Sequence, residues 1–301
     1  MAPPPVNPPA QLRAQHPRDT DRKRTGQGLM RQNGNDRRGG DRARRRHGGE
    51  RPEASARSPD FRKPGHDVVA IYGLHAVREA LVARRRKALT LYATAAAAER
   101  LGAAAGAAGA AIVVVEAADL DRRLGQSAVH QGVLLEARPL PQIDLSEIKL
   151  SSGVVLALDQ ITDPHNVGAI LRTAAAFAVD ALIVTERHAP DFSGVLAKTA
   201  SGGLEHVPLA PVVNLARALD ELGDLGYWRV GLDSEGAQSL EEMDLPRPLV
   251  LVLGAEGAGL RRLTRERCDV MARLDMPGPV KSLNVSNACA VALAYANLRR
   301  S

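Results

Sequence analysis

The stretch LVLVLGAEGAGLRRLTRERCDVMARLDMPGPVKSLNVSNACAVALAY, residues 249–295, decides the fold of this chain. It holds two short apolar runs, 249–253 and 271–276, each followed by a bend rich in glycine or proline, and from Ala288 onward it is typical of a buried helix. More polar side chains precede that helix than its N-terminus needs, because one Ser or Asn satisfies only one or two free backbone amides. The surplus, which indicates a ligand site, comprises Lys281, Ser282, Asn284, Ser286 and Asn287.

Similar apolar runs recur through residues 153–301, at 154–160, 181–186, 206–212 and 227–234, with helical segments between them. Because these runs lack polar alternation, we expect strands buried on both faces, and therefore an α/β domain with a mostly parallel sheet wrapped by helices. In such sheets ligands bind at the carboxyl ends of the strands. Three polar clusters follow strands in this domain and are the candidate site.

The first cluster is DQITDPHNVGAILRTAAAFAV, residues 159–179. A strand ends at Asp159, Asp163-Pro164 predicts a turn, and Asn166 stands where the N-cap of a helix belongs. Arg172 lies off the apolar stripe of that helix. Taken alone, the cluster favours a purely structural interpretation, with Asn166 as a cap and Arg172 as a solvated side chain.

The second cluster follows the apolar run 249–253, where Gly254, Gly257 and Gly259 surround Glu256. Glycines after a strand permit a positive φ or a close approach of the backbone to a ligand. The spacing is GxxGxG and not the GxGxxG of dinucleotide folds, and no acid stands about 20 residues on. A tight structural turn is the alternative, and a nucleotide-dependent dehydrogenase is disfavoured.

In the third cluster, Pro277-Gly278-Pro279 forces a rigid, non-helical path before the last helix. Ser282, Asn284 and Ser286 can then cap the helix, brace the loop and contact a small molecule. Three such clusters in one domain are a stronger signal than any one of them.

Together the clusters resemble the SpoU (TrmH) family of RNA ribose 2′-O-methyltransferases. NVGAILRTAAAFAV from Asn166 looks like its first motif, LVLGAEGAGL from Leu251 its second and MPGPVKSLNVSNACAVALAY from Met276 its third. The resemblance implies a trefoil-knotted fold, one of the exceptions to the rule against knots, an S-adenosyl-L-methionine cofactor and a homodimer. It is strongest to members that methylate a guanosine ribose in the peptidyl-transferase region of 23S rRNA.

The resemblance also implies the site residues. The polar catalytic surface would comprise Arg172, Asn166, Glu256, Ser282 and Asn284. The cofactor would be bound by Gly254, Gly257, Leu253, Leu274, Met276, Leu283 and Ser286. The chain departs from the family at Asp275, where the family often has Pro in Ile-Pro-Met, and this adds a charge near the pocket.

Arg172 is the residue most closely tied to the chemistry by the resemblance. An arginine is a poor general base because its pKa lies above 12. Our hypothesis is therefore that Arg172 steers the ribose and stabilises the developing alkoxide, with an RNA phosphate sharing the proton. An Arg172→Lys variant with near-full activity would argue against a need for the planar guanidinium.

The chain preceding the catalytic domain divides into three segments. Residues 1–66 hold 16 Lys/Arg and 7 Asp/Glu, whereas the rest of the chain holds 24 and 27. We interpret this segment as a disordered basic arm that binds RNA through its phosphates, or as a passive tail. Residues 67–138 alternate helix and strand and resemble the small substrate-binding domain, similar to ribosomal protein L30e, of many SpoU members. Residues 139–152 are the expected linker to the domain at 153–301.

The remaining features restrict the functional classes. Cys268 and Cys289 form no CxxC, which predicts a reducing, cytoplasmic setting, and Cys289 is expected to be a buried thiol. His165, His188 and His206 lack the spacing of a metal site, and no apolar run is long enough to span a membrane. Two alternatives stay open beside the rRNA enzyme: a tRNA ribose methyltransferase and a non-catalytic RNA-binding factor of ribosome assembly.

Overall fold

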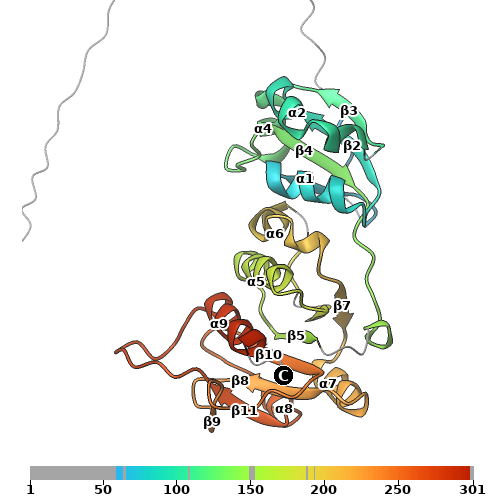
Figure 1. Ribbon diagram of the computed structural model, residues 1–301. Coiled ribbons are helices and arrows are strands. Elements are labelled where there is room, and N and C mark those ends of the chain that lie inside the picture. The colour runs from blue at the N-terminus through green and yellow to red at the C-terminus, as the bar shows by residue number, and fades with distance from the viewer. Residues whose placement is uncertain are drawn as a thin grey trace, which may run out of the picture. The chain divides into compact units, whose positions relative to one another are not determined.

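The computed structural model describes residues 59–63, 66–107, 109–148, 153–187, 189–192 and 194–298. These residues belong to one compact unit that contains two sheets (Figure 1). The predicted basic arm falls almost entirely outside the described residues, and it stays a prediction. Within the described residues, no helix combines the length and the apolar character needed to cross a bilayer.

The first sheet has four strands in the order β1-β4-β2-β3, of which β2 and β3 are parallel and the other pairs antiparallel. The elements of this region are β1 (Val69–Tyr72), α1 (Leu74–Ala83), β2 (Ala88–Ala93), α2 (Ala95–Leu101), α3 (Ala103–Ala107), β3 (Ala111–Val114), α4 (Ala117–Leu124) and β4 (Val133–Ala137). The alternation of helix and strand that the sequence predicted is confirmed, and the region begins with β1, which is only four residues long and runs directly into α1. Helix α1 packs through an apolar stripe, in which Leu74, Val77 and Leu81 are buried.

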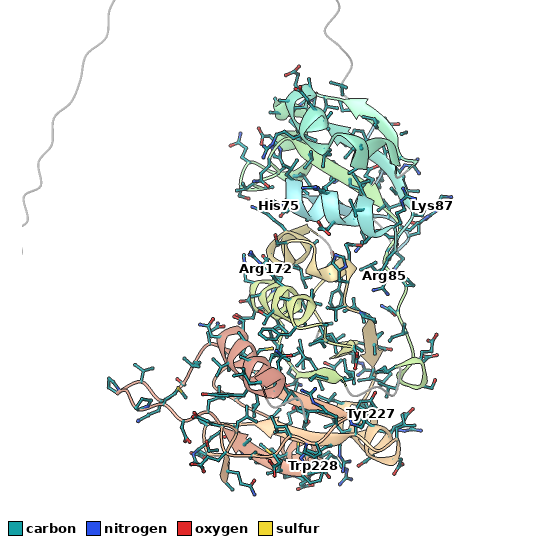
Figure 2. The ribbon with its side chains drawn as sticks, viewed as in Figure 1. His75, Arg85, Lys87, Arg172, Tyr227 and Trp228 are labelled. Atoms are coloured by element: carbon teal, nitrogen blue, oxygen red, sulfur yellow. The ribbon has the colours of Figure 1, made fainter. Side chains whose placement is uncertain are left out.

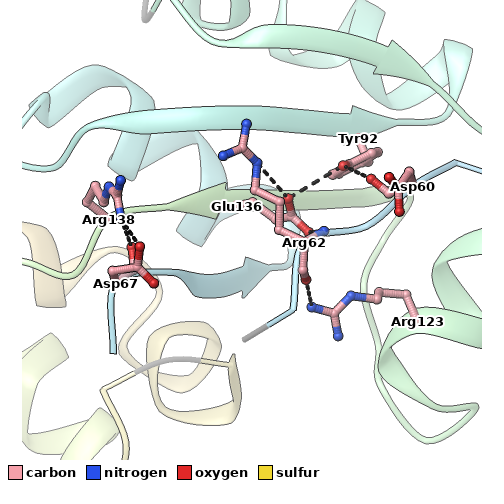
Figure 3. A network of polar contacts seen from close by, with 7 residues as sticks. All are labelled: Asp60, Arg62, Asp67, Tyr92, Arg123, Glu136 and Arg138. Atoms are coloured by element: carbon pink, nitrogen blue, oxygen red, sulfur yellow. Dashed lines mark hydrogen bonds and ion pairs between the residues drawn. The ribbon is translucent and has the colours of Figure 1, made fainter. Parts of the chain in front are cut away.

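A buried carboxylate, Glu136 of β4, holds the segment before β1 against this sheet (Figure 3). It accepts a hydrogen bond from the backbone amide of Arg62 at 2.9 Å, and the Tyr92 hydroxyl lies 3.4 Å away. The centroid of the Phe61 ring lies 4.6 Å from that of the Tyr92 ring, and the guanidinium of Arg123 lies over the face of Phe61. Burial raises the pKa of Glu136, while its hydrogen bond and ion pair with Arg62 act in the opposite direction.

The second sheet has seven strands, all parallel, in the order β7-β6-β5-β10-β8-β11-β9. Its strands are β5 (Val154–Asp159), β6 (Ala181–Thr185), β7 (Leu209–Val212), β8 (Trp228–Leu232), β9 (Gln238–Ser239), β10 (Leu249–Gly254) and β11 (Val270–Arg273). The helical segments are η1 (Leu145–Glu147), α5 (Pro164–Ala176), α6 (Gly194–Ala200), η2 (Gly203–Glu205), α7 (Leu215–Asp224), α8 (Arg262–Arg265) and α9 (Val285–Leu298), with η marking 3₁₀ turns. The predicted α/β domain with a mostly parallel sheet is confirmed. The trefoil knot stays a prediction.

Both faces of this sheet are covered, as the unbroken apolar runs predicted. Alternate residues of the central strands, such as Leu251 and Val252 of β10, belong to two different core clusters. The first cluster contains buried residues of α5, α6 and α9, and the second contains those of α7. Parallel strands buried on both sides in this way place all their carboxyl ends at one edge.

Residues of the expected linker pack against this second sheet. The backbone amide of Ile143 donates to the carbonyl of Leu209 at 2.9 Å. Leu145 and Ile148 are buried in the cluster that contains α7. The division into domains at 139–152 stays a prediction.

A buried ion pair joins the residues after α1 to the turn η2. Arg86 donates from Nε to one carboxylate oxygen of Glu205 at 3.0 Å and from Nη2 to the other at 2.7 Å. Both side chains are almost fully buried. The adjacent Gly203 lies against the backbone of α5, because a Cβ there would be 2.7 Å from the carbonyl oxygen of Leu171 and 2.9 Å from the Cα of Arg172. The turn η2 therefore contacts both α5 and Arg86.

Candidate active site

Helix α5 begins earlier than the sequence predicted. Asp163 is its N-cap and accepts a hydrogen bond from the backbone amide of His165 at 3.0 Å, with Pro164 at the start of the helix. Asp is a strong N-cap and Pro suits the first helical position. The prediction that Asn166 caps the helix is therefore wrong. Asn166 instead belongs to the first turn of the helix, and its side chain can form hydrogen bonds with other loops.

The glycine loop after β10 folds back over the end of its own strand. A Cβ on Gly254 would lie 2.3 Å from the carbonyl carbon of Gly259, so only glycine fits there. Gly257 and Gly259 have φ angles of 77° and 65°, which other residues rarely adopt. The GxxGxG spacing thus has a structural reason at each glycine, and the bend presents Glu256 at its tip.

The far end of this loop is fixed to the neighbouring strand. Asp159, the last residue of β5, is buried, and its carboxylate accepts hydrogen bonds from the backbone amide of Arg261 at 2.9 Å and from its Nε at 2.6 Å. Charge-assisted bonds of this kind are stronger than neutral ones. The glycine loop is therefore held at both ends.

The loop between β11 and α9 is braced by its own polar side chains. The Lys281 ammonium donates to the carbonyl of Met276 at 2.7 Å. Asn284 stands just before α9, and its Oδ1 accepts hydrogen bonds from the backbone amide of Ser286 at 2.9 Å and from its hydroxyl at 2.6 Å. Part of the polar surplus in this segment is accordingly structural.

The three clusters meet at Glu256. Its Oε1 accepts a hydrogen bond of 2.6 Å from the side-chain amide of Asn284 and one of 3.2 Å from that of Asn166. The Asn284 amide also donates to the Oδ1 of Asn166 at 2.9 Å. Asn166 in the first turn of α5, Glu256 in the loop after β10 and Asn284 in the loop after β11 thus form one polar group, which we call the Asn-Glu-Asn triad.

A cavity of about 500 Å³ opens beside this triad. Four leucines supply the apolar walls of the cavity. Leu232 belongs to β8, Leu253 to β10, Leu274 follows β11, and Leu283 lies in the loop before α9. The glycine loop contributes backbone from Gly254 to Gly259. The polar lining includes the carboxylates of Asp233, Glu235 and Glu256, so the cavity offers apolar walls together with negative charge.

Most of the residues expected at the cofactor site line this cavity. They are Leu253, Gly254, Gly257, Leu274, Met276 and Leu283. Ser286 is not among the lining residues, and its side chain instead donates to Asn284. Of the expected catalytic residues, Glu256 and Ser282 line the cavity, and Asn166 and Asn284 join it through the triad.

Arg172 is not bonded to the triad. It is on the exposed side of α5, as its position off the apolar stripe predicted (Figure 2). Among the described residues its guanidinium has no hydrogen-bond or ion-pair partner, so no intramolecular contact occupies its five donors.

One side of the cavity consists of residues that were not predicted from the sequence. Asp233, Ser234 and Glu235, which follow β8, line it, and so does Arg265, whose guanidinium forms an ion pair with Asp233. The signal was present, because these polar residues follow the apolar run of β8 at the same sheet edge as the other clusters. Applying the strand-end rule to that run as well would have found them.

The departure at Asp275 leaves the cavity intact. Asp275 does not line it, and its carboxylate accepts a hydrogen bond from Nε of Arg273 at 2.9 Å. Arg273 also donates to the carbonyls of Gly236 and Ala237, each at 3.1 Å. The extra charge is therefore paired locally instead of facing a ligand.

The described residues contain no group of three or more His, Cys, Asp or Glu arranged to bind a metal ion. His165 is exposed, and His206 contacts Glu79 at 3.1 Å. His188 lies outside the described residues. Cys268 and Cys289 are free thiols.

Comparisons with known proteins agree with this geometry. Residues 153–294 match the model of the SpoU rRNA methylase family, and residues 70–143 match that of the RNA 2′-O ribose methyltransferase substrate-binding domain. A relative from Pseudomonas putida is 40% identical over 240 residues, which cover 76% of this chain and 96% of the relative. The chain belongs to the SpoU methylase family. A second relative of this SpoU protein, from Pseudomonas aeruginosa, is 49% identical over 171 residues, covering 55% of this chain and 69% of the relative.

Both relatives are named 23S rRNA (guanosine-2′-O-)-methyltransferase RlmB. Among solved structures, an RNA methyltransferase of the TrmH family from Porphyromonas gingivalis matches this SpoU protein with a TM-score of 0.65 at 27% identity, covering 77% of this chain and 90% of the other. The methyltransferase AviRb from Streptomyces viridochromogenes, solved with AdoMet, matches with a TM-score of 0.66 at 23% identity over 77% of this chain and 89% of that one. The latter likeness supports the fold alone.

Proposed function

We propose that this protein catalyses the S-adenosyl-L-methionine-dependent 2′-O-methylation of a ribose in 23S rRNA, at a guanosine of the peptidyl-transferase region. The observation that carries the proposal is the Asn-Glu-Asn triad, which joins the three family motifs at the mouth of the 500 Å³ cavity. The names of the two Pseudomonas relatives support the substrate.

The residues of the cavity fit the cofactor. The leucine walls suit an adenine ring, and the backbone of the glycine loop can approach a ligand closely at Gly257, where a Cβ would point into open space. The carboxylates of Glu235 and Glu256 complement the positive charge of a sulfonium and an ammonium group. When bound, S-adenosyl-L-methionine supplies the methyl group, activated by the positive sulfur.

The side chains around the cavity then act on the ribose. The triad holds Asn166 in a fixed position and uses both N–H donors of Asn284, so the remaining N–H of the Asn166 amide and the exposed Ser282 hydroxyl can orient a 2′-hydroxyl at the cavity mouth. Arg172, with its donors unoccupied, steers an RNA phosphate and stabilises the negative charge that develops on the 2′ oxygen. It does not remove the proton, because a guanidinium is not deprotonated in proteins and has no acceptor; an RNA phosphate shares that proton.

The test is methyl transfer from labelled S-adenosyl-L-methionine to unmodified 23S rRNA and, in parallel, to tRNA, with the product mapped for ribose methylation. Methylation of a single rRNA guanosine that is lost in Arg172→Ala supports the proposal. Methylation of tRNA alone would keep the chemistry and refute the substrate. Transfer to neither, by a folded protein that binds RNA, would favour the non-catalytic assembly factor.

We also propose that the enzyme is a homodimer and acts in the cytoplasm. Apolar side chains at both ends of the α9 region, Val280, Leu283 and Leu298, are between 42% and 80% exposed and support a contact between two copies. A molar mass from light scattering equal to one chain would refute the dimer.

A further inference from the structure

A second cavity, of about 510 Å³, lies between α1 and the helices α2 and α3, within residues 78–104. Its lining includes Leu81 and Leu101, which are buried, and Val82, which is 56% exposed. Three arginines complete it: Arg78, Arg84 and Arg100. An apolar surface surrounded by guanidinium groups is thus open to solvent. The residues that line it are all different from those that line the cavity beside the triad.

These three arginines differ from most others in the described part of the chain. Arg86, Arg229 and Arg261, for example, are each paired with a carboxylate. The guanidinium groups of Arg78, Arg84 and Arg100 have no hydrogen-bond or ion-pair partner among the described residues. Three positive charges that share one cavity repel one another, and the described residues place no carboxylate in its lining. Their arrangement calls for an anionic ligand.

Helix dipoles explain only part of this arrangement. Arg100 lies in the last turn of α2 and Arg84 is the C-cap of α1, where a positive charge is favourable. Arg78 lies in the middle of α1 and has no such role. The dipoles also give no reason for the exposed Val82, which lies one helical turn beyond Arg78.

We propose that this cavity binds an unpaired nucleotide of the RNA substrate, with the base against Val82, Leu81 and Leu101 and the flanking phosphates on the arginines. Single-stranded RNA is recognised by this combination of an apolar or π surface for the base and cations for the backbone. The inference rests on the proposed function. The match of residues 70–143 to a substrate-binding domain favours RNA over an acidic protein segment, which would use the same charges.

The test compares Arg78→Gln/Arg100→Gln with Arg187→Gln/Arg217→Gln. The second pair removes the same charge from two arginines of the catalytic domain whose guanidinium groups also have no hydrogen-bond or ion-pair partner among the described residues. The probe is an unmodified 23S rRNA fragment that carries the target guanosine, and its binding is followed by fluorescence anisotropy at several salt concentrations.

Each phosphate contact to a single strand contributes about 0.7 to the slope of log K against log salt, so the first pair should lower the slope by about 1.4 and weaken binding on the order of 10-fold. Val82→Asp, at an exposed position that tolerates a polar side chain, should weaken binding similarly. The KM for RNA should rise in both variants, with kcat at saturating RNA and the affinity for S-adenosyl-L-methionine unchanged.

The outcomes separate this inference from the proposed function. If the wild-type protein binds the fragment without methylating it, the proposed function fails, and a lowered salt slope in Arg78→Gln/Arg100→Gln still supports the cavity as an RNA site. If the wild-type protein methylates RNA and the two double variants behave alike, the inference is overturned and the arginines serve another ligand, such as an acidic protein segment.

Discussion

The side-chain amide of Asn284 donates a 2.6 Å hydrogen bond to the carboxylate of Glu256, although the two residues belong to loops that follow different strands. The same amide group reaches Asn166, at the start of α5, at 2.9 Å. Because Glu256 is an acceptor only, its negative charge holds two donor side chains at the mouth of the cavity. The charge of Glu256 is therefore expected to matter more to catalysis than to folding.

Glu256→Gln tests that expectation. Gln keeps an oxygen acceptor but loses the charge that strengthens each of these hydrogen bonds and attracts a cationic cofactor, so kcat/KM for methyl transfer should fall about 10- to 100-fold. The melting temperature should change little, because Glu256 and Asn284 are exposed. Glu266→Gln is the control, since Glu266 pairs with Arg262 on the exposed helix α8. Equal activity of the two variants would remove the triad from the mechanism.

The buried pair of Arg86 and Glu205 predicts a large loss of stability when only one partner is removed. Arg86→Met leaves a carboxylate that is 2% exposed without its partner, which should cost about 3–5 kcal/mol in the free energy of unfolding. The double variant Arg86→Met/Glu205→Leu should recover most of that loss, because no unpaired charge is left behind. Urea unfolding of the single and double variants measures both effects.

Arg262→Met provides the comparison for that cycle. It breaks an exposed pair with Glu266, and such pairs contribute about 0–1 kcal/mol. A similar small loss in Arg86→Met would show that Glu205 becomes hydrated when its partner is removed.

The sequence predicted the parts of the site that depend on local pattern. Unbroken apolar runs predicted the parallel sheet, and polar or glycine-rich segments after three of those runs contained every member of the triad. The helix stripe of α5 placed Arg172 on the exposed side. These predictions are possible because a strand buried on both faces needs an unbroken apolar run, and the first polar residues after that run mark where the strand ends.

The features that the sequence did not predict depend on competition between neighbouring residues for one role, or on contacts between residues far apart in the chain. Asn166 resembles an N-cap, but Asp163 and Pro164 together make a better helix start three residues earlier. The pairing of Arg86 with Glu205 joins residues 119 positions apart, and no local pattern encodes it. The roles of Gly254 and Gly203 are of the same kind, since each is fixed by backbone that packs against it.

Glu136 predicts a specific dependence of stability on pH. Burial raises the pKa of Glu136 in the folded state, so the folded protein binds this proton more tightly than the unfolded chain. The contribution of protonated Glu136 to the free energy of unfolding is therefore fully present below the ordinary glutamate pKa, about 4.3. It is lost as the pH rises through the raised pKa of the folded state. Glu136→Gln removes this penalty and should be more stable than the wild-type protein at pH 7.5, with the difference shrinking as the pH falls toward 4.5.

Melting temperatures of the two proteins between pH 4.5 and 8 measure this effect. Glu99→Gln, at an exposed position on α2, should follow the wild-type curve. If Glu136→Gln is less stable by the same amount at every pH, the hydrogen bonds that the carboxylate accepts from Arg62 and Tyr92 outweigh the cost of its burial.

The two cysteines should be unreactive in the folded protein. Burial raises the pKa of the Cys268 thiol and of the Cys289 thiol to about 12 each, and Cys289 is 1% exposed, which confirms the buried thiol expected from sequence. Because the thiolate is the nucleophile, the reactive fraction at pH 8 is on the order of 10⁻⁴. Ellman's reagent should detect no fast-reacting thiol in the native protein and both thiols in guanidinium chloride. A fast native reaction that disappears in Cys268→Ser would show that burial does not protect Cys268, which donates to the carbonyl of Thr264 at 3.3 Å.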